Sequence, residues 1–264
     1  MRYKDAEEFK TANGYTIDEA WYPRVTRILE IKAKPALDNF FREMENYASA
    51  ETVKNKSAEE GTLVHQTVEK IVRGEDVAIP ETITPAIEAF QKFNRHNQIA
   101  FHPDYLERQV WSGRHRYAGT VDALASVGGK FGVLDIKTSS GFYPEYNLQT
   151  AAYVMALQEF PVKRSLGLSH DIETRWILRI NQHRICKACN SVMREKGGRT
   201  TIKDGRKKTG VLCSEADHSW GEREGDVELR EFPYTYHDTK AFLAAKLLWE
   251  WENNYWLRKI GYTE

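Results

Sequence analysis

Two aspartates in the middle of the chain have the spacing of a paired carboxylate site. Asp122 lies in the segment RYAGTVDALASV and Asp135 lies in KFGVLDIKT, with Gly128 and Gly129 between the two segments. Both segments have the residue types of long strands, and two glycines between such strands predict a tight β-hairpin. With the two glycines at the turn, Asp122 lies opposite Asp135. The two carboxylates would then repel each other unless a cation lies between them.

This carboxylate pair predicts a divalent metal site. Oxygen ligands suit hard cations such as Mg²⁺ or Mn²⁺, which bind phosphate oxygens and acidify a water molecule. Side chains alternate along a strand, so Lys137 points to the same face as Asp135. Leu134 and Ile136 point to the opposite face, towards a core. The lysine could therefore hold or deprotonate an attacking water and stabilise charge on a phosphorane-like transition state. The alternative is an exposed strand face with a cross-strand ion pair.

A helix is expected to bring a histidine to this hairpin. Ser57 and Glu60 have the spacing of a capping box, and apolar residues follow at helical spacing until Gly74. The pattern predicts a helix that begins near Ser57 and carries His65. Further helices are expected after Pro23, from Pro35 through LDNFFREMENYA, from Thr84 and Pro85, over residues 147–160, and from a cap at Asp238. Further strands are expected at YLERQVW, TRWILRI and DVELREFPY.

Four short segments occur in a characteristic order along the chain. They are GTLVH (61–65), GTVDAL (119–124), LDIKTS (134–139) and QTAAY (149–153). In this order, with a helix, a hairpin and a helix between them, the chain resembles the RecB-like branch of the PD-(D/E)XK nucleases. That branch includes the exonuclease domains of recombination helicase-nucleases and the CRISPR-associated spacer-acquisition nucleases. The resemblance covers residues 20–160 together with the last strands and helix.

The resemblance implies roles for particular residues of this sequence. The implied metal ligands are His65, Asp122, Asp135 and the main-chain carbonyl of Ile136, and the implied catalytic lysine is Lys137. These expectations agree with the chemistry that the carboxylate pair and the lysine suggest by themselves.

Three further residues are candidates for the same site. Gln149 and Tyr153 match the Q-x-x-x-Y motif of the family. Their spacing puts them on one helix face, from which they could reach the scissile phosphate and neighbouring DNA. The alternative is a hydrogen-bonded core glutamine beside a packed tyrosine. Glu107 precedes the hairpin, where the family often carries a glutamate near the site, but it could equally be a surface residue.

The implied fold is α/β, a restriction-endonuclease-like core with a mixed central sheet flanked by helices. Residues 1–180 and 226–264 would form this core, with an N-terminal helical arch over the site. The implied reaction is Mg²⁺- or Mn²⁺-dependent hydrolysis of DNA, by an exonuclease acting on ends or single strands in recombination, repair or phage replication. A helicase or recombination protein is the expected partner besides DNA. The alternatives are a catalytically inactive nucleic-acid-binding module and a restriction-type endonuclease.

Residues 181–225 form the expected insertion and hold every cysteine of the chain. Cys186 and Cys189 form one Cys-x-x-Cys unit, and Cys213 and His218 form a second pair. This spacing is typical of a zinc ribbon, so we expect a structural Zn²⁺ in a small inserted arm. A flexible hairpin with incidental cysteines is the alternative. Competing fourth ligands are His170, His183 and His237.

An iron–sulfur cluster is not expected. Several RecB-like nucleases use one cysteine before the histidine motif and three near the C-terminus for such a cluster, but here no cysteine precedes Cys186.

Any case for nucleic-acid binding from charge must be local. Lys and Arg total 38, as do Asp and Glu, so the net charge of zero gives no global attraction to a polyanion. One basic cluster is present, with only two acidic residues among its cations: Arg194, Lys196, Arg199, Lys203, Arg206, Lys207 and Lys208. We expect either phosphate contacts without sequence readout or a solvated loop.

The composition is that of an ordinary globular protein. Hydrophobic residues make up 41% of the chain and charged residues 29%, and no run of apolar residues is long enough to span a membrane. The polar N-terminus, MRYKDAEEFK, does not resemble a signal peptide. Few cysteines in one local group favour a reducing compartment, so the cytoplasm is the expected location.

Overall fold

The computed structural model describes residues 3–205, 210, 211 and 213–263. The first elements are α1 (Ala6–Asn13), β1 (Gly14–Ile17), β2 (Ala20–Pro23), α2 (Val25–Ile28), η1 (Leu29–Ile31), α3 (Pro35–Glu43), α4 (Tyr47–Val72), α5 (Thr84–Asn97), β3 (Ala100–Phe101) and η2 (Pro103–Tyr105). Four strands and two helices follow, namely β4 (Arg108–Ser112), β5 (Tyr117–Val121), β6 (Ala123–Val127), β7 (Lys130–Lys137), α6 (Pro144–Leu157) and α7 (Phe160–Leu166). The last elements are β8 (Thr174–Ile185), β9 (Val192–Lys196), β10 (Arg199–Lys203), η3 (Glu215–Asp217), β11 (Glu224–Glu231), α9 (Tyr236–Glu252) and α10 (Asn254–Lys259).

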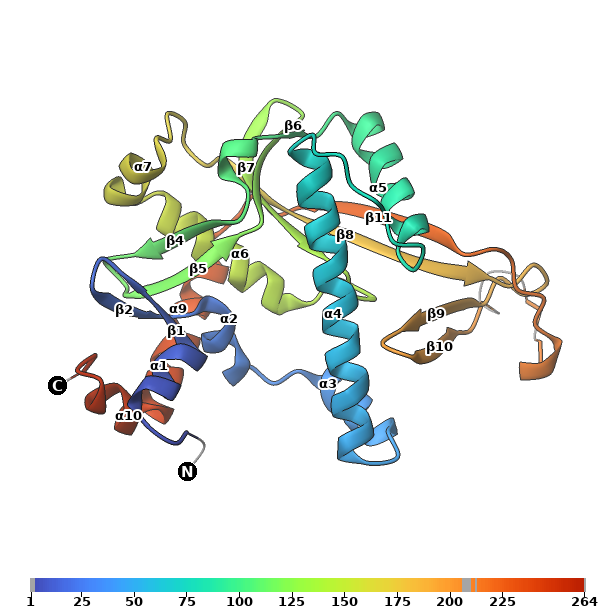
Figure 1. The fold of residues 1–264 in the computed structure, drawn as a ribbon, viewed down its shortest axis with the longest axis horizontal. Coiled ribbons are helices and arrows are strands. Elements are labelled where there is room, and N and C mark those ends of the chain that lie inside the picture. The colour runs from blue at the N-terminus through green and yellow to red at the C-terminus, as the bar shows by residue number, and fades with distance from the viewer. Residues whose placement is uncertain (1–2, 206–209, 212, 264) are drawn as a thin grey trace.

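The centre of the molecule is a seven-stranded mixed sheet. Its order is β10-β9-β8-β7-β6-β3, and β11 pairs with β8 beside this path. Strands β7 and β8 are parallel, and the other neighbours are antiparallel. The pairs β1–β2 and β4–β5 form two smaller sheets. The protein is therefore a mixed α/β structure, in which helices flank a mixed central sheet (Figure 1).

Helices cover both faces of this sheet. Val68 of α4 and Phe90 of α5 belong to one buried cluster with Leu134 and Ile136 of β7. A second cluster joins Val133 of β7 to residues of α6 and α9 on the other face. The alternation in β7 thus agrees with the prediction that Leu134 and Ile136 point to a core. It leaves Asp135 and Lys137 on the face that α6 covers.

The hairpin turn has the predicted register. Gly128 and Gly129 have φ values of 57° and 81°, a conformation that glycine adopts without steric cost, and Val127 pairs with Lys130. The prediction of one continuous strand before the turn is wrong, because regular pairing stops at Asp122, which separates β5 from β6. The Asp122 carboxylate accepts a 2.7 Å hydrogen bond from the Ile136 N–H. A side chain thus replaces the main-chain partner that a continuous ladder would supply.

The helix that carries His65 is longer than predicted. It begins at Tyr47, where the side chain of Asn46 accepts a 2.8 Å hydrogen bond from the Ser49 N–H. Ser57 lies inside this helix, so the predicted start there is wrong. The reason is that Asn46 already caps the first turn, and nothing between the two residues breaks the helix. At the other end, α4 stops before Gly74, as predicted.

The remaining helices differ from the predictions mainly at their ends. The helix from Pro35 ends at Glu43, before residues 44–48 of the predicted segment, and the helix predicted over 147–160 covers Pro144–Leu157. Helix α5 begins at Thr84, as predicted. The final helix begins at Tyr236, with Thr235 at its cap position. Asp238 lies in its first turn and pairs with the buried Arg175, so the predicted cap at Asp238 is wrong.

Residues 181–225 form an arm that continues the central sheet. Strand β8 is 12 residues long and pairs with β11 from Trp176 and Glu231 out to His183 and Glu224. The end of β8 also pairs with β9, which forms a hairpin with β10. The expected boundaries at 180/181 and 225/226 therefore fall inside β8 and β11. Figure 1 shows the two long strands running side by side into the arm.

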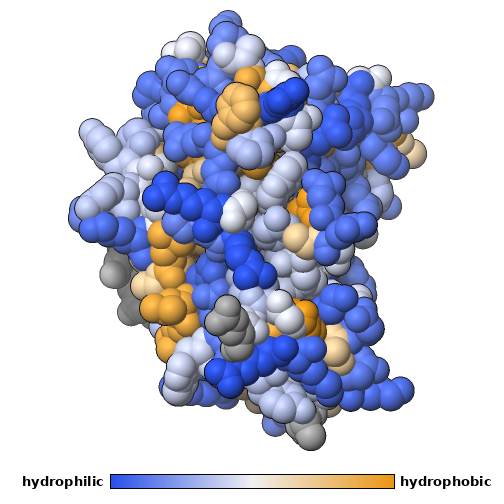
Figure 2. All heavy atoms as spheres, turned by 90° about the vertical axis from the view of Figure 1, so that its left-hand side faces the viewer, coloured by the Kyte–Doolittle hydropathy of each residue, from blue (hydrophilic) through white to orange (hydrophobic). Residues whose placement is uncertain are grey.

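Both ends of the described chain lie at the same end of the molecule, at the lower left of Figure 1. The face viewed from that side is mainly hydrophilic, with separate apolar patches (Figure 2). Among the described helices, none combines the length and apolar character that crossing a membrane requires.

Candidate functional site

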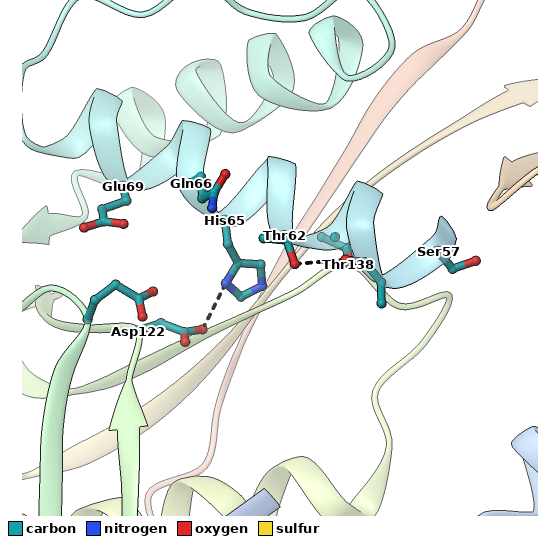
Figure 3. Close-up of a pocket in the computed structure, with 10 residues that line it drawn as sticks. Ser57, Thr62, His65, Gln66, Glu69, Asp122 and Thr138 are labelled. Carbon is teal, nitrogen blue, oxygen red and sulfur yellow. Dashed lines mark hydrogen bonds and ion pairs between the residues drawn. The ribbon is translucent and has the colours of Figure 1, made fainter. Parts of the chain in front are cut away.

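Three potential metal ligands converge where α4 crosses the hairpin. Ligand atoms of His65, Glu107 and Asp122 all lie within 4.8 Å of one another. His65 comes from α4, Glu107 precedes β4, and Asp122 stands between β5 and β6. His65 points from the helix towards Asp122, with 3.6 Å between His65 Nδ1 and Asp122 Oδ2 (Figure 3). The break in the hairpin strand is therefore the position at which a carboxylate meets the helix.

Asp135 lies beside this group but contacts other partners. Its side chain is 1% exposed, and Lys137 Nζ lies 2.7 Å from its Oδ2. Gln149 Nε2 donates a 3.2 Å hydrogen bond to Asp135 Oδ1. Lys137 Nζ also lies 5.0 Å from the centre of the Tyr146 ring. The structure thus brings Asp135, Lys137 and Gln149 together, as the motifs predicted.

Burial and charge perturb the acids and the lysine of this site. Burial raises the pKa of Asp135 to about 6, although Lys137 opposes the shift. Burial also raises the pKa of Asp122. Desolvation alone would lower the pKa of Lys137, but the carboxylates of Asp135 and Asp122 outweigh it, so the lysine pKa is raised. Lys137 is therefore a cation near neutral pH.

Burial and charge also perturb the other two members of the ligand group. Burial, followed by the charges of Asp122 and Glu69, raises the pKa of Glu107 to about 7. Glu107 has a left-handed backbone with φ of 50°, and its N–H donates to the Asp122 carbonyl. Desolvation, followed by the charge of Lys137, lowers the pKa of His65 to about 4. The imidazole is therefore neutral near pH 7 and has a free lone pair for a metal.

Tyr153 supports Gln149 from inside the core. Gln149 Nε2 lies 3.0 Å from the Tyr153 hydroxyl, and Tyr153 is 2% exposed. A Cβ atom at Gly119 would lie 2.5 Å from the Tyr153 ring, so only glycine fits at that position. The two motif residues share a helix face, as expected, but Tyr153 is packed away from solvent. Its position in this structure agrees with the alternative of a packed tyrosine.

Two adjoining cavities surround the end of β7. The first has a volume of about 510 Å³ and contains His65, Glu107 and Asp122 in its wall. The second has a volume of about 680 Å³, and Ser57 and Thr138 line both cavities. Thr138 directly follows Lys137, so the two cavities share a wall residue next in sequence to the lysine.

The four predicted zinc ligands lie together in the arm. Ligand atoms of Cys186, Cys189, Cys213 and His218 are within 4.8 Å of one another. Desolvation would raise the pKa of Cys186, but hydrogen bonds from the main chain of Cys189, the side chain of His218 and the main chain of Ala188 lower it to about 6. The cluster could hold a metal ion.

The competing histidines lie elsewhere. His183 Nε2 is 3.9 Å from Glu224, His170 packs against Phe131, and His237 packs against Tyr236. The fourth member of the cysteine group in the described structure is therefore His218.

In its described part the basic segment is a β-hairpin, formed by β9 and β10, and not a loop. Arg194 and Lys196 lie on β9 and donate to the main-chain oxygen of Thr138, each at 2.7 Å. Arg199 pairs with Glu43 at 2.6 Å, and Lys203 at the end of β10 is exposed. The remaining three predicted DNA contacts lie outside the described residues, and they are Arg206, Lys207 and Lys208. The hairpin packs back onto the core because β8 carries it along the sheet.

Sequence reasoning missed Thr138 and the hairpin that reaches it. Thr138 stands inside the LDIKTS segment, but its role as an acceptor for two cations depends on residues far along the chain. The sequence did contain a signal for this hairpin, namely the two adjacent glycines Gly197 and Gly198. In the structure they form its turn, with φ values of 62° and 77°. The same turn chemistry that identified the first hairpin could have identified this one.

A comparison of the chain with protein-family models gives no match, and a comparison with curated proteins gives none either. The functional conclusion therefore depends on the geometry of the site and on the four ordered motifs.

Proposed function

We propose that the protein is a metal-dependent nuclease of the RecB-like PD-(D/E)XK type that hydrolyses DNA phosphodiester bonds. The proposed core is restriction-endonuclease-like, and an exonuclease acting on DNA ends or single strands is the favoured form. The observation that carries this proposal is the group of His65, Glu107 and Asp122 in the wall of one cavity, with the buried Asp135–Lys137 pair close enough to Asp122 for its charge to shift the pKa of both.

The donor set fits a hard divalent cation such as Mg²⁺ or Mn²⁺. Two carboxylates and a neutral imidazole lie within reach of one ion, and Asp135 and the Ile136 carbonyl are further candidate ligands. Desolvation is the main cause of the raised pKa values of Glu107 and Asp122, and a bound cation would stabilise both carboxylates in their charged forms. When bound, such an ion would polarise the phosphate and lower the pKa of a water molecule.

Lys137 is proposed to act as a fixed cation. Because the neighbouring carboxylates raise its pKa, the ammonium keeps its proton near pH 7 and is a poor base. Its charge lies beside Asp135, one residue before Thr138, which lines both cavities. From there it can stabilise negative charge that develops on the phosphate. Gln149 holds the second oxygen of Asp135 and so fixes the orientation of that carboxylate.

A nuclease assay on three substrates tests the proposal. End-labelled single strands, end-labelled duplexes and covalently closed circles would be incubated with Mg²⁺, with Mn²⁺ and without divalent cations. We expect metal-dependent loss of the linear substrates and persistence of the circle. Cutting of the circle would favour a restriction-type endonuclease. Binding without cleavage in every metal condition would favour an inactive nucleic-acid-binding module.

A further inference from the structure

The arm holds a group of metal-ligand side chains separate from the active site. Its members are Cys186, Cys189, Cys213 and His218. Ligands of a tetrahedral zinc ion, at about 2.3 Å for sulfur and about 2.0 Å for nitrogen, lie roughly 3.5 Å apart. Cys189 Sγ and His218 Nδ1 are 3.5 Å apart. Three thiols and an imidazole are soft donors that favour zinc over the hard cations suited to the carboxylate site.

The main chain around the cysteines forms a closed turn at the base of the β9–β10 hairpin. The Asn190 N–H donates to the Cys186 carbonyl at 3.0 Å, and the Cys186 N–H donates to the Ser191 carbonyl at 2.8 Å. Ser191 also contacts Cys189 Sγ at 3.1 Å and accepts the Gly205 N–H at 3.1 Å. Ser191 therefore contacts both the segment that precedes β9 and the segment that follows β10. An ion bound by the cysteines would fix both ends of the hairpin.

The far side of this hairpin contacts the end of the catalytic strand. Arg194 Nη2 and Lys196 Nζ both donate to the Thr138 carbonyl at 2.7 Å, and Lys196 Nζ also lies 2.6 Å from Thr138 Oγ1. Thr138 directly follows Lys137. The arm thus delivers two cations to a point next to the proposed catalytic lysine.

The hairpin turn is fixed against the helix that carries His65. The Gly197 N–H donates to Glu60 at 2.9 Å, and a Cβ atom at Gly197 would lie 2.1 Å from Ser57 Oγ. Glycine is therefore required for this approach, both for its positive φ and for the space. The arm and α4 form one continuous wall at this point.

The cavity bounded by this wall has the side chains of a nucleic-acid groove. Five cations and three aromatic residues line it with a single acid, Glu145. The cations are Lys32, Lys34, Lys54, Arg194 and Lys196, and the aromatic residues are Phe40, Tyr143 and Tyr146. Cations attract backbone phosphates, and aromatic faces stack on unpaired bases. The groove opens beside the active-site cavity, because Ser57 and Thr138 line both.

We propose that a Zn²⁺ ion bound by Cys186, Cys189, Cys213 and His218 holds the β9–β10 hairpin in place. Arg194 and Lys196 then form the cationic wall of a groove that takes unpaired nucleotides next to the scissile phosphate. The zinc site stands on the ligand cluster alone, whereas the role of the groove rests on the proposed nuclease function. Figure 1 shows the arm as an extension of the sheet, with β9 and β10 on one side of α4.

Elemental analysis of protein purified without chelator tests the metal. We expect about one zinc per chain and negligible iron, since a structural site retains its ion through purification. Cys189→Ser should lose the zinc, and His237→Gln, which removes a histidine outside the cluster, should keep it. Cobalt substitution should give the thiolate charge-transfer band and the visible bands of a tetrahedral site. Less than about a tenth of an equivalent of zinc in the parent protein would overturn the site.

Binding of a fluorescein-labelled oligothymidylate of about fifteen nucleotides tests the wall. The Asp135→Asn background suppresses cleavage and leaves the groove intact. In this background Lys196→Met should raise the Kd about 10-fold and lower the slope of log Kd against log salt by about one. Lys196→Arg should restore most of the affinity. Lys92→Met, an exposed lysine on α5, should bind like the parent. Cys189→Ser, which loses the zinc, should also bind the oligonucleotide more weakly. Its circular dichroism spectrum should show that α4 and the core sheet remain folded.

The outcomes separate this proposal from the proposed function. Unchanged oligonucleotide affinity in Lys196→Met, in an enzyme that cleaves DNA, would overturn the wall and leave the nuclease intact. Equal binding of a blunt duplex, with the same dependence on Lys196, would overturn the assignment to unpaired nucleotides. Absence of both cleavage and binding in the parent would contradict the nuclease and with it the groove, while the zinc content would still decide the metal site.

Discussion

Gln149 on α6 reaches across to β7 and donates a 3.2 Å hydrogen bond to the buried Asp135 carboxylate. The same amide nitrogen lies 3.0 Å from the Tyr153 hydroxyl, which anchors it to the core. Gln149 is therefore a positioning residue for Asp135. We expect Gln149→Ala to lower kcat about 10-fold, because one oxygen of Asp135 loses its hydrogen bond from α6. The Mg²⁺ concentration for half-maximal activity should rise as well. Tyr153→Phe, which keeps the packing, should lower kcat by only about 2-fold. A larger effect of Tyr153→Phe than of Gln149→Ala would contradict this order.

Replacing either metal-side aspartate should abolish cleavage while the fold remains. We expect Asp122→Asn and Asp135→Asn each to reduce the rate at least about 10³-fold, because each removes a charged ligand of the proposed metal. The metal-free Asp122→Asn variant should be at least as stable as the parent, since a desolvated charge is removed, whereas metal-free Asp135→Asn should be less stable because Lys137 loses its counter-charge. Urea unfolding and end-labelled DNA cleavage would measure the two effects. Asp104→Asn, an exposed aspartate in η2, is the matched control. Parental turnover in either variant would refute the active-site assignment.

Lys137→Ala should separate catalysis from metal binding. We expect the rate to fall about 10²- to 10³-fold, since a preorganised charge near the reacting phosphate is lost. Calorimetric titration with Mn²⁺ should still show binding, because the ammonium is not itself a ligand. Lys130→Met changes an exposed lysine at the other end of the same strand and should keep the parental rate. If Lys137→Ala cleaves at the parental rate, Lys137 is only a strand-face charge.

Glu107 should make the metal-free protein less stable as pH rises. Its pKa is about 7 in the fold against an ordinary value of 4.5, so between these values the folded state keeps a proton that the unfolded state releases. The unfolding free energy therefore falls as pH increases through this window. Glu107→Gln should remove that loss and be more stable than the parent at pH 8 by about 1 kcal/mol, a small gain because the side chain is exposed to solvent. The two proteins should be equally stable near pH 4.

His65 contributes the opposite slope. Its pKa is about 4 in the fold against 6.5, so the unfolded state holds the extra proton and stability rises with pH between these values. Comparing Glu107→Gln with the parent cancels this contribution. Urea unfolding at several pH values would measure the difference, with the exposed Glu88→Gln as a control. A difference between Glu107→Gln and the parent that does not change with pH would contradict the prediction.

The ion pair between the buried Arg175 and the partly exposed Asp238 should respond unequally to loss of its two partners. Arg175 is fully buried and donates to the Asp238 carboxylate and, at 3.1 Å, to the Tyr234 carbonyl. Asp238→Ala leaves a buried cation without its counter-charge, so we expect a loss of about 3 kcal/mol. Arg175→Met removes the charge with little change in volume and should cost less than about 1 kcal/mol. Asp171→Ala breaks an exposed pair with Lys163 and should have almost no effect. Chemical unfolding of the three variants would show the order, and equal losses for both partners would contradict it.

The hairpin of β6 and β7 could be predicted from the sequence because its determinants are local. Gly128 and Gly129 supply the positive φ values that a two-residue turn requires, and this fixes which residues face one another. The alternation of β7 then fixes the common face of Asp135 and Lys137. The strand break at Asp122 could not be predicted in this way. It depends on a side chain that bonds the Ile136 N–H across the sheet, and the residue types on either side still have the pattern of a strand.

Other features were mispredicted because they depend on residues that lie elsewhere in the chain. The start of α4 was misplaced because Ser57 and Glu60 satisfy a capping pattern inside a helix already capped by Asn46. Lys196 and Thr138 are 58 residues apart, so their contact requires the full order of strands in the sheet. A run of cations has the same sequence pattern whether it is solvated, phosphate-bound or packed against a carbonyl oxygen.

The pairing of β8 with β11 places the arm at the tip of a hairpin. Their outermost pair is His183 with Glu224, and the strands continue from there to Trp176 and Glu231 in the core. The arm thus occupies the position that a turn of about two to five residues would fill in an ordinary antiparallel connection. A chain without the arm, closed by such a turn, would keep every β8–β11 pair. The arm is therefore an insertion at a single connection between two paired strands. Its length could change during evolution without altering the order of the core strands.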